Sequence, residues 1–159
     1  MGNEIERKYL IHGLPFQLSD YPCHEIEQAY LNTEPVIRIR RQDNDYYLTY
    51  KSKGLMVRRE ENLPLDADSY RHLLKKADGN IITKTRYKIP FDNGLTIEID
   101  VFHGKFQGLI LAEVEFPTED AANAFIPPDY FGEDVTFSSE YHNSTLSRAP
   151  CKTGLKVVF

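Results

Sequence analysis

Near its start the sequence places acidic and basic side chains at alternate positions, Glu4, Glu6 and Lys8. In an extended strand, side chains two residues apart lie on the same face. Two carboxylates held that closely repel each other unless a cation lies between them. Carboxylate oxygens are the usual ligands of a hard divalent cation such as Mg²⁺. This segment therefore predicts a strand face that is able to bind a metal ion.

The same alternation recurs along the chain, so that one face of successive strands is almost purely ionic. Like charges two positions apart are separated by only about 7 Å, which is unfavourable without a counter-ion. The residues in this phase are seven acids and seven bases: Glu4, Glu6, Glu60, Glu98, Asp100, Glu113, Glu115, Lys8, Arg38, Arg40, Lys51, Arg58, Lys84 and Arg86. The opposite phase is mainly apolar and includes Ile5, Tyr9, Ile39, Ile97, Ile99 and Val114.

Two arrangements are compatible with this pattern. In the simpler one, the charges form the solvated outer face of an antiparallel sheet over an ordinary core. In the other, the sheet closes into a barrel whose lumen is charged and whose apolar exterior is covered by helices. Almost purely ionic positions and like-charge pairs favour the second. Basic side chains bind phosphate and acidic pairs bind divalent metal, so a linear phosphate chain carried with Mg²⁺ or Mn²⁺ would satisfy both.

The elements that must position these residues are short strands joined by tight turns. Strands are expected at residues 3–11, 25–31, 36–42, 46–52, 57–63, 81–89, 95–102 and 109–116. Asp43-Asn44-Asp45 and Asp92-Asn93-Gly94 are typical of hairpin turns. Helices are expected at residues 66–77 and 118–125, each beginning at a residue suited to capping. The sequence thus predicts an α+β fold, mainly β: an eight-stranded antiparallel barrel forming a charged tunnel, with a few flanking helices.

Composition limits the classes to which the chain can belong. Its 159 residues suggest a single domain at residues 1–147 with a tail at residues 148–159. A net charge of −5 disfavours a nucleic-acid duplex as partner, and the absence of a long apolar run disfavours the membrane. Two distant cysteines and no apolar leader at the start suggest free thiols in the cytoplasm. The oligomeric state stays open, a homodimer included.

The ordered motifs resemble those of the CYTH superfamily, also called triphosphate tunnel metalloenzymes. The opening E-I-E-R-K matches the E-x-E-x-K signature of that superfamily, and the resemblance extends over residues 2–147. Further matches are Gln28, Tyr30, R-I-R at residues 38–40, Lys51, Arg58, Glu60, K-T-R-Y at residues 84–87, E-I-D at residues 98–100 and E-V-E at residues 113–115. The sequence differs from the family pattern at Asn62, which is often acidic, and around Asn143, where a lysine is often found.

The resemblance implies an eight-stranded barrel that binds a triphosphate together with a divalent metal. On this interpretation Glu4, Glu6, Glu113 and Glu115 hold the metal, assisted by Glu60, Glu98 and Asp100. Lys8, Arg38, Arg40, Lys51, Arg58 and Arg86 bind the phosphates. Lys84 is the candidate general base, because neighbouring cations and burial would lower its pKa, or else one more phosphate ligand. In relatives a tyrosine here at Tyr30 acts beside that lysine, although simple packing would also explain it.

The expected activity is hydrolysis of inorganic tripolyphosphate to diphosphate and phosphate with Mg²⁺ or Mn²⁺. The alternatives within the family are thiamine triphosphatase, nucleoside triphosphatase and class IV adenylate cyclase. A non-catalytic module that binds polyphosphate or a nucleotide belongs to a different class. The intact acidic pairs argue against such a binder, because phosphate binding alone needs only the bases.

Overall fold

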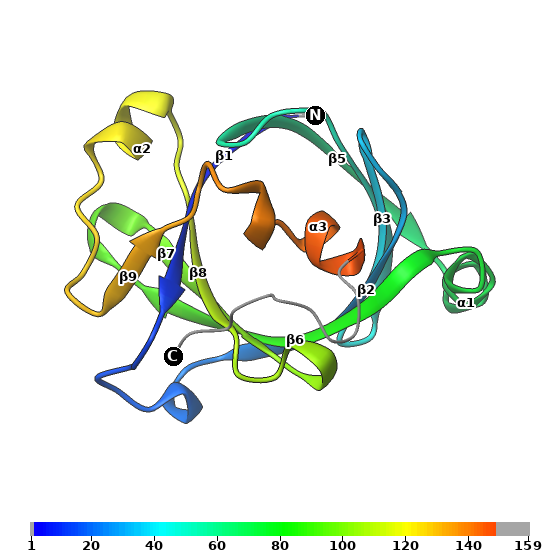
Figure 1. The fold of residues 1–159 in the computed structure, drawn as a ribbon, viewed down its shortest axis with the longest axis horizontal. Coiled ribbons are helices and arrows are strands. Elements are labelled where there is room, and N and C mark those ends of the chain that lie inside the picture. Colours follow the sequence, from blue (N-terminus) through cyan, green and yellow to red (C-terminus); the bar gives the residue numbers. More distant parts are fainter. Residues whose placement is uncertain (1, 149–159) are drawn as a thin grey trace.

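The computed structural model describes residues 2–148 and has nine strands in one antiparallel sheet. Eight of the strands close into a barrel, which Figure 1 shows as a ring seen end on. The strands are β1 (Gly2–Ile11), β2 (Cys23–Thr33), β3 (Val36–Gln42), β4 (Asp45–Lys51), β5 (Val57–Leu65), β6 (Asp78–Pro90), β7 (Thr96–Phe102), β8 (Ile110–Glu115) and β9 (Phe131–Asp134). The predicted class, an eight-stranded antiparallel barrel within a mainly β fold, is confirmed.

The strand order is β5-β4-β3-β2-β6-β7-β8-β1, and β1 closes the ring by pairing with β5. The two predicted hairpin turns form as the sequence indicates. Asp43 between β3 and β4 has a φ of 53°, and Asn93 and Gly94 between β6 and β7 have φ values of 60° and 72°. Asn, Asp and Gly tolerate this left-handed region better than other residues do. These turns set the register that places the charged phase inside.

Helices are few and short: α1 (Ala67–Leu74), α2 (Glu119–Ala124) and α3 (Asn143–Arg148). Single-turn 3₁₀ segments lie at η1 (Leu18–Asp20), η2 (Asp92–Gly94), η3 (Gly104–Phe106) and η4 (Ser139–Tyr141). Asp66 caps α1 by accepting from the backbone N–H of Ser69 at 2.7 Å, and Thr118 caps α2 by accepting from Ala121 at 3.1 Å. The two helices predicted from their caps are therefore present, and each is shorter than its predicted range.

The apolar phase of the strands faces outward and is covered there, as the barrel hypothesis requires. α1 covers one side, where Tyr70 packs on Ala29 and Ile39. A larger cluster lies outside β1, β7 and β8, where α2, residues 14–21 and residues 125–131 pack on Ile97, Ile99 and Val114. Since the core lies outside the ring, the lumen is left to the polar side chains.

The segment after β8 was not fully anticipated. β1 changes partner along one edge: residues Gly2–Ile5 pair with β5, whereas Tyr9 and Ile11 pair with the short strand β9. The chain then continues through η4 into α3, which is drawn in orange and red inside the ring of Figure 1. Leu146 of α3 is fully buried in an apolar cluster with inward side chains such as Ile82, Phe102 and Leu111. This cluster closes one end of the lumen.

The expected boundary at residue 147 falls within α3, and residues 149–159 of the predicted tail lie outside the described residues. No helix among residues 2–148 is both long enough and apolar enough to cross a membrane.

Candidate active site in the barrel lumen

The lumen contains a cavity of about 670 Å³ that is open at the end away from α3. Thirteen of the fifteen predicted site residues line this cavity, and each of the eight barrel strands supplies at least one of them, β2 through Tyr30. They are Glu4, Glu6, Lys8, Tyr30, Arg38, Arg40, Lys51, Arg58, Glu60, Arg86, Glu98, Glu113 and Glu115. Lys84 and Asp100 are the two exceptions. The strands thus bring together ionic side chains that are up to 111 positions apart, from Glu4 to Glu115.

Acidic side chains are concentrated on β1 and β8, where the register places Glu6 opposite Glu115 and Lys8 opposite Glu113. Burial, with the nearby carboxylates of Glu113 and Glu4, raises the pKa of Glu6 to about 8. Burial and the acids Glu4, Glu60 and Glu98 also raise the pKa of Glu115. This wall of the cavity holds the four acids Glu4, Glu6, Glu113 and Glu115 against the single base Lys8, and repulsion among the acids adds to the effect of burial in both shifts.

Two lysines are each paired with acids of nearby strands inside the lumen. Lys51 Nζ lies 2.8 Å from Glu4 Oε1 and 3.5 Å from Glu60 Oε2. Lys8 Nζ lies 3.6 Å from Glu113 Oε1. Although burial opposes ionisation of Glu113, Lys8 and Arg86 hold its pKa well below the usual range. Glu113 and Lys8, whose pKa is raised chiefly by Glu113 against the effect of burial, are therefore both charged in the folded protein.

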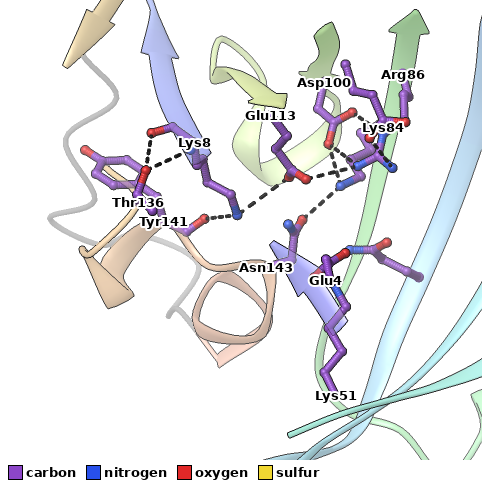
Figure 2. A network of polar contacts seen from close by, with 12 residues as sticks. Glu4, Lys8, Lys51, Lys84, Arg86, Asp100, Glu113, Thr136, Tyr141 and Asn143 are labelled. Atoms are coloured by element: carbon purple, nitrogen blue, oxygen red, sulfur yellow. Dashed lines mark hydrogen bonds and ion pairs between the residues drawn. The ribbon is translucent and has the colours of Figure 1, made fainter. Parts of the chain in front are cut away.

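Lys84, Asp100 and Arg86 form a cluster at one side of the lumen (Figure 2). Asp100 is fully buried and accepts from Arg86 Nε at 2.8 Å and from Arg86 Nη2 at 2.9 Å. Lys84 Nζ lies 2.7 Å from Asp100 Oδ2 and donates to Asn143 Oδ1 at 3.2 Å. Burial, with Arg86 and Arg40 nearby, lowers the pKa of Lys84 to about 7 despite the attraction of Asp100.

Three guanidinium groups stand apart from this pattern. Among residues 2–148, no carboxylate lies within 4 Å of Arg38, Arg40 or Arg58, although all three line the cavity. Arg38 donates to Thr49 Oγ1 at 3.1 Å, and Arg40 donates to Gln28 Oε1. Burial and the neighbouring guanidinium groups of Arg38 and Arg86 lower the pKa of Arg40 to about 10. This part of the lumen has uncompensated positive charge, which is the environment that an oxyanion needs.

The donor set of the acidic wall fits a hard divalent cation. Within residues 2–148, no three His, Cys, Asp or Glu side chains are already grouped closely enough to hold a metal ion. Burial, together with the neighbouring acids Glu113 and Glu4, nevertheless raises the pKa of Glu6 to about 8, so a cation there would relieve the repulsion between the carboxylates. Glu4, Glu6, Glu113 and Glu115 offer only oxygen ligands, which Mg²⁺ and Mn²⁺ prefer.

Sequence reasoning missed the contribution of the segment that follows β9. Tyr141 O accepts from Lys8 Nζ at 3.4 Å, and His142 and Asn143 line the cavity. Figure 2 shows Tyr141 beside Lys8 and Asn143 beside Lys84. In the sequence, Asn143 stands out only through its neighbours, which differ from the family pattern. The helix α3, which begins at Asn143, has only six residues and is too short to show a helical periodicity. The polar run that precedes a buried leucine, Leu146, is the one local signal that could have indicated it.

The open end of the cavity also has a less polar edge that was not predicted. It is formed by the turn between β3 and β4 and by the end of β5, and its residues are Asn44, Asp45, Tyr46, Tyr47, Leu63, Pro64 and Leu65. Tyr47 O–H donates to Gln42 Oε1 at 2.7 Å, which fixes the ring beside the opening. The edge therefore combines aromatic and aliphatic surface with the charged lumen.

Comparison with known proteins identifies the class to which this barrel belongs. The sequence pattern of the CYTH domain matches residues 2–149, nearly the whole chain. The chain belongs to the CYTH domain family.

Among individual relatives, an inorganic triphosphatase of Nitrosomonas europaea is 40% identical over 149 residues, covering 91% of this chain and 96% of the relative. A second inorganic triphosphatase, from Acetivibrio thermocellus, is 32% identical over 156 residues, covering 96% and 97%. The crystal structure of an inorganic triphosphatase superimposes with a TM-score of 0.70 at 37% identity, covering 94% of this chain and 97% of that one.

Proposed function

We propose that this protein is a divalent-metal-dependent triphosphatase that hydrolyses inorganic triphosphate to diphosphate and phosphate. The observation that carries the proposal is the division of one lumen into two parts. Within the described residues 2–148, Arg38, Arg40 and Arg58 have no carboxylate partner, while the wall of β1 and β8 has excess carboxylate. A triphosphate with its metal supplies the anion that the first part lacks and the cation that the second part lacks. Its similarity to two inorganic triphosphatases supports the same substrate.

Binding of the phosphates is assigned to six bases, Lys8, Arg38, Arg40, Lys51, Arg58 and Arg86. Phosphoryl transfer requires mainly positioning and electrostatic stabilisation. The three unpaired guanidinium groups can bind phosphate oxygens directly, and their fixed forks suit bidentate contacts. Lys8, Lys51 and Arg86 stay paired with acids of the lumen, so they hold those acids in place as well as attract the anion. Charge on the leaving diphosphate is stabilised by the same groups.

Metal binding is assigned to Glu4, Glu6, Glu113 and Glu115, assisted by Glu60 and Glu98. Held by these carboxylates, Mg²⁺ or Mn²⁺ would supply positive charge to offset that of the phosphate oxygens and would lower the pKa of a water molecule. We give Asp100 a different role from the predicted one, since it is buried behind the cavity surface and accepts from both Arg86 and Lys84. Asp100 positions these two cations.

Lys84 and Tyr30 keep the two roles that the sequence allows. The pKa of Lys84, lowered to about 7, supports a general base that can be neutral near physiological pH. Its position favours an electrostatic role instead, because Asn143 and Asp100 bind its ammonium group and it does not line the cavity. Tyr30 lines the cavity and also packs in the apolar cluster with Leu146. Activity measurements on Lys84 variants separate the alternatives.

The proposal is tested by the release of orthophosphate from tripolyphosphate, thiamine triphosphate, ATP and pyrophosphate at a fixed Mg²⁺ concentration. We expect the highest kcat/KM with tripolyphosphate. The aromatic and aliphatic edge near Tyr47 makes ATP and thiamine triphosphate the informative competitors, because it could contact an organic group. Binding of tripolyphosphate without any release would indicate a non-catalytic binder, and cyclic nucleotide from ATP would indicate a cyclase.

The proposed setting is a reducing cytoplasm, since Cys23 is an exposed free thiol. The proposed partner is the small-molecule triphosphate, with no nucleic-acid duplex.

A further inference from the structure

Gln28 is an amide built into the wall of the barrel. It lies on β2, opposite Arg40 on β3 and Ile82 on β6, and it is fully buried. Gln28 Oε1 accepts from Arg40 Nε at 2.8 Å and from Arg40 Nη2 at 2.5 Å. A guanidinium group has only donors, so these contacts fix which end of the amide faces Arg40.

The other end of this amide has no acceptor among residues 2–148. Gln28 Nε2 is a buried donor without a hydrogen bond, which is an unfavourable state for a polar atom. An apolar side chain of similar length would avoid it. Stability of the barrel wall therefore does not account for glutamine at this position, whereas the orientation of Arg40 does.

Arg86 shows what a charged acceptor does in the same lumen. Asp100 accepts hydrogen bonds from Nε and Nη2 of Arg86, and Gln28 accepts hydrogen bonds from the same two atoms of Arg40. The carboxylate compensates the charge of Arg86, while the amide leaves the charge of Arg40 uncompensated. Arg40 also keeps three of its five N–H groups free of Gln28, and it lines the cavity.

We infer that Gln28 is a positioning residue that holds Arg40 in place with a neutral acceptor, so that its full positive charge acts on the phosphate chain. This inference rests on the proposed function, because it assumes that a polyphosphate is the anion that Arg40 binds. It explains why the acceptor is an amide: a carboxylate would orient the guanidinium equally well but would compete with the substrate for it.

The decisive variant is Gln28→Glu, which keeps the shape and adds the competing charge. The KM for tripolyphosphate should rise by about tenfold or more, with the thermal midpoint equal to or above that of the wild type. The dissociation constant of tripolyphosphate in the presence of a chelator should rise by a similar factor, which removes any contribution of bound metal. Gln107→Glu makes the same charge change at an exposed site and should leave both constants within twofold of wild type.

Gln28→Met provides an independent result if the glutamate variant does not fold. It removes both the acceptor and the unpaired buried donor, so the thermal midpoint should stay the same or rise while KM increases. Arg40→Met should raise KM at least as much as either change at Gln28. A Gln28→Met protein with a lower midpoint and an unchanged KM would overturn the inference in favour of a purely structural role.

The same experiments distinguish an error in this inference from an error in the proposed function. If the wild type neither binds nor cleaves tripolyphosphate, the proposed function is wrong. If the wild type is active and Arg40→Met raises KM, but Gln28→Glu leaves KM within twofold, the function stands and the role of Gln28 is refuted.

Discussion

At the scale of single residues, the lumen is organised by which charges have a partner. Lys8, Lys51 and Arg86 are paired with carboxylates, whereas Arg38 and Arg58 are not. Paired cations hold the site together, and unpaired cations repel one another until an anion binds. Replacing a paired cation should therefore lower the stability of the protein, whereas replacing an unpaired cation should leave the stability unchanged or raise it.

Arg38→Met should therefore raise the KM for tripolyphosphate by about tenfold or more while leaving the thermal midpoint unchanged or higher. The reason is that the change removes a substrate ligand and also a repulsive charge. Steady-state kinetics and thermal unfolding measure the two effects. Arg59→Met, on the exposed side of β5, is the matched control and should alter neither. A large fall in the midpoint of the Arg38 variant would contradict the assignment.

Lys84→Ala separates the base from the electrostatic role. If Lys84 is the general base, kcat should fall by about 100-fold or more with a much smaller change in KM. Parallel losses in kcat/KM and in tripolyphosphate affinity would refute the base assignment. Lys53→Ala, at an exposed lysine near Glu34, is the control.

His142 should make stability fall in mild acid. Burial, with Lys8 and Arg58 nearby, lowers the pKa of His142 to about 4 from an ordinary value of 6.5. Between these two pH values the unfolded chain binds a proton that the folded protein does not, so the free energy of unfolding falls as the pH falls. The contribution amounts to about 2 kcal/mol at pH 5 relative to pH 7.

The corresponding variant, His142→Asn, should lose this part of the pH dependence between about pH 4 and pH 6.5. Urea unfolding at pH 5 and pH 7 measures it. His72→Asn, on the exposed face of α1, should keep the slope of the wild type. An unchanged slope in the His142 variant would show that this imidazole is protonated in the folded state.

At the scale of elements, the short C-terminal helix α3 contributes both to the packing of the barrel and to the candidate site. It contacts β2 and β6 from inside the barrel, and Leu146 is fully buried among inward apolar side chains. Tyr141 O, just before the helix, accepts from Lys8 Nζ, and Asn143, the first residue of the helix, accepts from Lys84 Nζ. α3 thus links the closure of one end of the lumen to the position of two cations.

Leu146→Ala should destabilise the protein by about 2–5 kcal/mol, because it leaves a cavity where the helix meets the barrel. Chemical unfolding measures the loss. Ile126→Ala, at a side chain that is 83% exposed, should cost little. A cost below about 1 kcal/mol for the Leu146 change would mean that α3 does not hold the closed end in place.

The same elements show what the sequence can and cannot predict. Period-two alternation assigns each strand residue to the inner or outer face, and twelve of the fourteen ionic residues that it assigned to the inner face line the cavity. Alternation does not predict how deeply an inward side chain is buried behind the surface of the cavity. Lys84 and Asp100 have the correct phase, yet tertiary contacts with Asn143 and Arg86 bury them behind the surface. β9 and α3, with four and six residues, are too short for a periodic signal.

At the scale of the whole molecule, the fold reverses the usual placement of apolar and charged side chains. The apolar phase of the strands is covered from outside by α1, α2 and the loops, so that the interior can be ionic. Closing the sheet brings a wall rich in guanidinium groups and a wall rich in carboxylates into one cavity of about 670 Å³. Full-length similarity to inorganic triphosphatases is consistent with this arrangement being the working part of the molecule.

The most direct test of the account is orthophosphate release from tripolyphosphate by chelator-treated wild-type protein, measured as Mg²⁺ or Mn²⁺ is added back. The account predicts no release without metal, saturable release with it, and loss of that release in Glu6→Gln, where the excess of carboxylate is reduced. Metal-independent hydrolysis, or a Glu6→Gln variant with wild-type metal dependence, would contradict the claim that the two walls of the lumen act on one metal-bound triphosphate.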